Sequence, residues 1–125
     1  MQSLIHYSTR TVMAFVLSCG LALAGEADVV DAKITKQGEH FRVDATIRSN
    51  DTGWDYYADR FDVLAPDGTI LGTRILHHPH ENEQPFTRSL NRLVIPAGVE
   101  TVVVRASMKP DGASGDTVTL TVPSE

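Results

Sequence analysis

The segment Phe41-Arg42-Val43-Asp44-Ala45-Thr46-Ile47-Arg48 decides the fold of this chain. Apolar and polar residues alternate along it without interruption, so every second side chain points to the same side of an extended strand. One face is then apolar and the other is charged or hydroxylic, which is typical of a strand that covers a core on one side and meets water on the other. We therefore expect a β-strand near residues 39–49.

The same period of two recurs on both sides of this segment, and no window of 12 residues carries a helical stripe. Turn signals separate the alternating runs, and the clearest is Ala65-Pro66-Asp67-Gly68, because glycine accepts the positive φ that tight hairpins require. The pattern predicts strands near residues 27–36, 39–49, 55–65, 69–77, 86–95, 100–108 and 116–123. Seven short strands at this spacing predict an all-β fold, a single immunoglobulin-like antiparallel β-sandwich over residues 25–125.

One part of this pattern is similar to a known family. The segment Phe61-Asp62-Val63-Leu64-Ala65-Pro66-Asp67-Gly68 resembles bacterial FxLYD-type sandwich domains, with Phe61 and Gly68 at the spacing of that family. Val63, Leu64 and Ala65 stand where the family has Leu, Tyr and Asp. The region from Trp54 to Leu90 also resembles small secreted bacterial proteins of unassigned function. These resemblances imply a sandwich fold and a bacterial envelope location, and they carry over no functional residue.

The first 24 residues are typical of a secretory signal. Arg10 is followed by the apolar run 11–24, and Ala22-Leu23-Ala24 supplies the small residues that signal peptidase requires. We expect cleavage after Ala24 and a secreted or periplasmic mature protein without a transmembrane span, since this run is shorter than the ~20 apolar residues that cross a bilayer. Two alternatives stay open: an uncleaved amphipathic anchor, and a lipoprotein modified at Cys19, which follows Val16-Leu17-Ser18.

Removal of residues 1–24 would change the charge and the cysteine content of the chain. The whole chain has a formal net charge of −5 and one cysteine, and loss of Arg10 and Cys19 leaves a cysteine-free domain at −6. Such a domain depends on its own apolar core, because no disulfide can stabilise it. A net negative chain without basic runs is also a poor partner for nucleic acid or for anionic membranes.

A cluster of histidines predicts the first candidate site. His77, His78 and His80 stand within four positions, and neutral imidazole is a common ligand for zinc and copper. If strand geometry continued past Leu76, His78 and His80 would project from one face, with His77 on the other and Glu81 adding an oxygen donor. The alternatives are a solvated polar edge and a pH-sensing role.

Aromatic residues predict a second candidate site. Trp54, Tyr56 and Tyr57 form a dense patch, and strand alternation prevents burial of both tyrosines. An exposed tryptophan or tyrosine there would suit a partner surface, whereas core packing is the alternative. We also expect Arg74, Arg88 and Arg92 to form salt bridges on the strand faces.

No catalytic motif is present in the sequence. The mature chain contains no nucleophile elbow, no cysteine, no phosphate-binding glycine loop and no zinc-protease helix motif. We therefore expect a protein that is not an enzyme and has no cofactor: a secreted or periplasmic binding or interaction module with an envelope protein as partner. The alternative is a periplasmic copper- or zinc-binding protein that uses the segment from His77 to His80.

Overall fold

The structure, a computed structural model, describes residues 26–124. The predicted signal peptide, its cleavage site after Ala24 and Cys19 lie outside these residues. Strands make up all of the regular structure within them, so no helix there is long and apolar enough to cross a membrane. The strands are β1 (Asp28–Gln37), β2 (His40–Arg48), β3 (Tyr57–Leu64), β4 (Ile70–Ile75), β5 (Phe86–Leu93), β6 (Thr101–Lys109) and β7 (Val118–Thr121).

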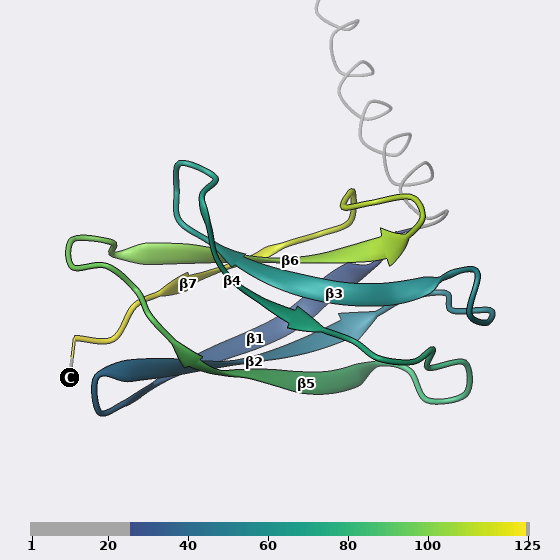
Figure 1. Cartoon of the computed structure of the whole chain (residues 1–125), viewed down its shortest axis with the longest axis horizontal. Helices are drawn as coiled ribbons and strands as arrows, with labels where there is room; N and C mark the ends of the chain where they lie inside the picture. The colour runs from purple at the N-terminus through teal and green to yellow at the C-terminus, as the bar shows by residue number, and fades with distance from the viewer. Residues whose placement is uncertain (1–25, 125) are drawn as a thin grey trace, which may run out of the picture.

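The seven strands form two antiparallel sheets, which Figure 1 shows as two layers. One sheet has the order β1-β2-β5 and the other has the order β4-β3-β6-β7. The prediction of an all-β sandwich with seven strands is confirmed. In constant-type immunoglobulin domains the fourth strand joins the sheet of the first, second and fifth. Here β4 pairs with β3 instead, so the sheets have three and four strands.

The core lies between the sheets and consists of the residues that the alternating pattern places on the apolar faces. Phe61, Ile47 and Met108 are among its largest fully buried side chains, and burial of each stabilises the fold by about 1.5–3 kcal/mol. Both sheets contribute to one continuous cluster. Its members include Phe41, Val43, Ala45 and Ile47 from β2, Phe61 and Val63 from β3, and Val102, Val104, Ala106 and Met108 from β6.

Strand β4 ends earlier than the alternating pattern predicts. The predicted strand reaches residue 77, whereas β4 ends at Ile75. Leu76 continues the alternation, since its side chain is buried in the core and its amide donates to the carbonyl of Asp59 on β3, and the chain leaves the sheet after it. His77, His78 and His80 therefore lie in a loop, and the condition for His78 and His80 to share one strand face is not met.

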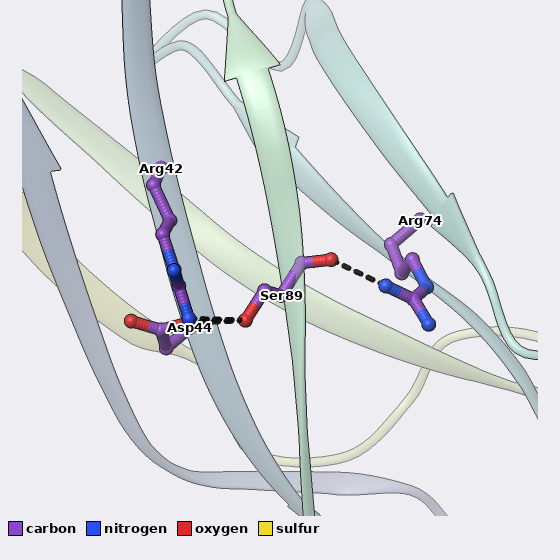
Figure 2. A network of polar contacts seen from close by, with 4 residues as sticks. All are labelled: Arg42, Asp44, Arg74 and Ser89. Carbon is purple, nitrogen blue, oxygen red and sulfur yellow. Dashed lines mark hydrogen bonds and ion pairs between the residues drawn. The ribbon is translucent and has the colours of Figure 1, made fainter. Parts of the chain in front are cut away.

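Polar contacts join the two sheets at both sides of the sandwich. On one side the guanidinium of Arg74 on β4 donates to the backbone oxygen of Ser89 on β5, at 2.6 Å, and Figure 2 shows this contact. On the other side the amide of Val29 donates to the carbonyl of Asp116, while the amide of Asp116 donates to the Asp28 carboxylate. Gly115 permits this second approach, because a Cβ there would collide with the carbonyl oxygen of Ala27.

Candidate functional site

Three loops lie together at the end of the sandwich where the described chain begins. They are residues 49–56, 76–85 and 110–117, at the right of Figure 1, and we call this region the N-terminal end. Within residues 26–124, all ten lysines and arginines lie in strands, whereas ten of the fifteen acids lie outside them. The N-terminal end carries seven of those ten acids: Glu26, Asp51, Asp55, Glu81, Glu83, Asp111 and Asp116.

The carboxylate of Asp51 connects two of these loops. Asp51 is 8% exposed, and its Oδ1 accepts hydrogen bonds from the Ser49 hydroxyl (2.7 Å) and the Ala58 amide (3.0 Å). Its Oδ2 accepts from the amide of His80, at 2.8 Å, across 29 positions of sequence. Gln84 adds a second link, since its side chain accepts from the amide of Ser49 and donates to the carbonyl of His80. Loops 49–56 and 76–85 therefore form one hydrogen-bonded unit.

The imidazole of His80 is part of this unit. The ring stacks on Phe86 with centroids 3.8 Å apart, and its Nε2 lies 2.9 Å from a guanidinium nitrogen of Arg88. Because arginine only donates, Nε2 accepts and the proton of the neutral ring is on Nδ1, which is buried without a partner among the described residues. Burial lowers the pKa of His80, and the charges of Arg88 and His78 lower it further. His80 is therefore a neutral, packed histidine.

The other residues of the predicted metal site lie around His80 with different exposure. His77, His78 and Glu81 are exposed, and the rings of His78 and His80 lie 4.6 Å apart. Glu81 reaches the neighbouring loop, where its Oε2 is 3.6 Å from the position that a Cβ of Gly53 would occupy. Among residues 26–124, no three His, Cys, Asp or Glu side chains are grouped so that they could hold a metal ion. Copper or zinc binding stays a prediction.

The aromatic residues of the second predicted site differ strongly in exposure. Trp54 is 61% exposed and Tyr57 is 9% exposed. Their rings meet edge to face, with centroids 5.8 Å apart and planes at 73°, and the ammonium of Lys109 lies 5.7 Å from the centre of the Tyr57 ring. Tyr56 is partly buried; burial raises the pKa of its hydroxyl, and Asp111 beside it raises that pKa further. We call Trp54, Tyr57 and Lys109 the Trp54 platform.

Sequence reasoning missed a buried carboxylate on the outer face of the four-stranded sheet. Asp62 is fully buried although Phe61 and Val63 on either side of it face the core. Its oxygens accept from Thr73 (2.7 Å) and Arg105 (3.0 Å), and Arg60 lies at 3.5 Å. The alternation places Asp62 on the outer face correctly, but only the register of β3 with its neighbours shows that two arginines cover it.

A shallow polar groove of about 520 Å³ crosses the outer face of the other sheet. Asp44 lies in it between Ser89, whose hydroxyl donates to the carboxylate, and Arg42, at 2.9 Å (Figure 2). Burial alone would raise the pKa of Asp44, but the hydrogen bonds from Ser89 and Arg42 and the charges of Arg42 and Lys33 bring it below its usual value. These groups satisfy one another, so the groove offers a ligand few free donors.

Comparison with known proteins gives one relative that covers most of the chain. Over 96 residues, or 76% of this chain, the sequence is 35% identical to a protein of Halomicrobium mukohataei named "Putative lipoprotein". The matched region is 47% of that protein, so the chain spans about half the length of the curated relative it matches. No protein-family model matches the chain, so the resemblance to FxLYD-type domains stays a prediction.

Proposed function

We propose that this protein is a non-catalytic interaction module of the cell envelope, and that the Trp54 platform is its contact site for a protein partner. The name of its relative and the predicted signal segment support an envelope location. The β-sandwich supports a binding role by analogy only, since sandwiches commonly present loops to partners.

The observation that carries this proposal is the exposure of Trp54 on a fixed base. A 61% exposed tryptophan offers a large apolar contact area, and tryptophan is among the residues that most often dominate binding energy. The ring rests on buried Tyr57, and its loop is held by Asp51, so binding requires little further ordering of the loop.

The charge around Trp54 supports a basic contact surface on the partner. Asp55, Glu81 and Glu83 are exposed at the N-terminal end, and although the platform itself includes Lys109 at the end of β6, no lysine or arginine of residues 26–124 lies in the loops of this end. A lysine or arginine of the partner would gain from these carboxylates, and it would also gain from the face of the indole ring through a cation–π contact of about 0.5–2 kcal/mol.

The bonding of the buried polar groups supports the absence of catalysis. Asp51 and His80 are the groups at this end that most resemble an acid–base pair, but the Asp51 oxygens already accept three hydrogen bonds. The Nε2 of His80 accepts from Arg88. A general base needs a free lone pair within reach of a substrate proton, and these two groups have structural partners instead.

Site-specific photo-crosslinking in the native envelope tests the proposal. A benzophenone amino acid at position 54 is compared with the same group at position 94, because Trp54 and Val94 are almost equally exposed, at 61% and 63%, and lie at opposite ends. We expect a discrete protein adduct from position 54 that is absent from position 94 and weakens in high salt. No adduct from position 54, or the same adducts from both positions, would refute the proposed surface.

A further inference from the structure

Four strand edges of the sandwich are available for pairing: β1 and β5 in one sheet, and β4 and β7 in the other. The backbone N–H and C=O groups along an edge can pair with any strand that approaches. Natural sheets therefore protect their edges with charged residues, bulges, short strands or covering contacts. Within residues 26–124, every edge carries some of this protection, and β4 differs from the others in exposing two isoleucines beside its open edge.

Each of the other three edges is protected in its own way. Strand β1 has a bulge after Val29, its first residues are held by the segment before β7, and Lys36 points inward over Phe41. Strand β5 is distorted near its end, where Arg92 has a φ of 59°. The guanidinium of Arg74 also donates a hydrogen bond to the carbonyl of Ser89 on this strand. Strand β7 has only four residues.

Strand β4, Ile70-Leu71-Gly72-Thr73-Arg74-Ile75, has one bulge, at Leu71, where its register with β3 shifts. Its sequence has no proline or acid, and its one charged residue, Arg74, reaches across to β5 and to the carbonyl of Ile75. Ile70 and Ile75 are 49% and 50% exposed, and Thr73 is exposed between them. From Ile70 to Thr73, no backbone hydrogen bond from another part of the described chain occupies the open edge, although Leu90 and Leu93 of β5 pack close to Gly72.

We infer that the free edge of β4 binds an extended, acidic segment of a partner polypeptide, which adds to the four-stranded sheet as a fifth strand. This mode of recognition takes its affinity from main-chain hydrogen bonds and its specificity from alternate side chains. The architecture accommodates such a strand, because variable-type immunoglobulin domains carry additional strands on the corresponding sheet. The inference concerns a different surface from the Trp54 platform and does not depend on it.

The residues beside β4 define the chemistry of the added strand. The register places Ile75 next to Arg60 and Thr73 next to Asp62, with Arg105 beyond. Arg60 and Arg105 share the single carboxylate of Asp62, so one positive charge is left without a partner in this cluster. An added strand with apolar side chains against Ile70 and Ile75 and a carboxylate between them fits this edge.

Charge also argues against a second copy of this chain as the occupant. Two copies, each with a formal net charge of −5, repel one another. Pairing of β4 with β4 would also place Arg60 and Arg105 of both copies beside the same strand pair, where like charges repel. A short segment with one carboxylate carries far less negative charge than a second copy and brings no arginine cluster, so it reduces the first penalty and avoids the second.

Nuclear magnetic resonance titration of the protein with a designed peptide tests the inference. The peptide is acetyl-Thr-Val-Thr-Glu-Thr-Val-Thr-amide, in which two valines and the glutamate lie on one face of a strand. The matched control replaces the glutamate with lysine. We expect saturable shifts of the amide signals of residues 70–75, with affinity about fivefold to tenfold weaker for the lysine peptide. Ile75→Lys should abolish these shifts, whereas Val94→Lys, a change at a still more exposed site in the loop after β5, should not.

Three results would overturn the inference. The first is no shift in residues 70–75 at millimolar peptide, and the second is equal binding of both peptides. The third is protection of the β4 amides that rises with protein concentration in the absence of peptide, which would identify a second copy as the occupant. Because the titration leaves the Trp54 platform unchanged, its failure is distinguishable from failure of the proposed function.

Discussion

Removal of the Asp51 carboxylate is the perturbation that tests the construction of the N-terminal end most severely. Asp51→Ala leaves three donors without their acceptor: the Ser49 hydroxyl and the amides of Ala58 and His80. Asp51→Asn can keep one oxygen as the acceptor for the first two donors. Its NH₂ group then faces the His80 amide and cannot accept a hydrogen bond from it. A graded loss of stability is therefore expected, with alanine worse than asparagine.

The magnitude follows from the burial of these donors. A buried donor that loses its acceptor costs about 1–3 kcal/mol, so Asp51→Ala should lower the free energy of unfolding by about 3–5 kcal/mol and Asp51→Asn by about 2 kcal/mol. A domain of this size has about 5–15 kcal/mol in total. The alanine variant should therefore lose more than about 12 °C in Tm, at about 4–8 °C per kcal/mol.

Urea denaturation followed by two probes measures this loss. Far-ultraviolet circular dichroism reports the sheets, and the fluorescence of Trp54, the single tryptophan, reports the loop that contains Asp51. Asp55→Asn is the matched control, because Asp55 is an exposed acid of the same loop and its replacement should change stability by less than about 0.5 kcal/mol. Most surface substitutions change the free energy of unfolding by less than about 0.5 kcal/mol. If Asp51→Ala changes it by no more than that, the hydrogen-bonded unit described above is wrong.

Three further predictions concern the sheets and pH. Gly115→Ala should destabilise the fold by about 1–3 kcal/mol, because its Cβ would meet the Ala27 carbonyl, and an unchanged Tm would contradict this. Arg74→Met should cost about 1–2 kcal/mol in urea denaturation, since the Ser89 carbonyl loses its charged donor; an equal midpoint would show that the sheets do not need this contact. Burial and the adjacent guanidinium lower the pKa of His80 from 6.5, so the unfolded chain binds the proton more tightly and stability should fall as pH drops below that value. Tm measured against pH should show this fall, His80→Gln should reduce it, and an identical profile for both proteins would contradict the assignment.

The fold could be predicted from the sequence because its main signal is local. The alternation of Phe41, Val43, Ala45 and Ile47 identifies both the strand and its buried face, and the structure buries all four. Glycine at position 68 identifies the hairpin, where its amide donates to the carbonyl of Ala65 with φ at 94°. Period-two patterning and turn chemistry are properties of neighbouring residues, so the order of strands along the chain follows from them.

The polar contacts could not be predicted because they join residues that are distant in sequence. Arg74 and Arg88 were expected to form salt bridges on the strand faces, whereas they contact the Ser89 carbonyl and the His80 ring. The burial of His80 depends on the loop that begins after Leu76, whose backbone is held at His80 by Asp51 and Gln84. One-dimensional patterns identify His80 as a candidate but carry no information on its partners.

The affinity of the crosslinked partner for purified variants of this protein tests the central claim most directly. If Trp54 is the main contact, Trp54→Ala should raise the Kd about 30-fold, equivalent to about 2 kcal/mol, while Val94→Ala leaves it within about twofold. Circular dichroism would verify that both variants keep the fold. Equal affinity of Trp54→Ala and the unmodified protein would contradict the claim that the Trp54 platform is the binding surface.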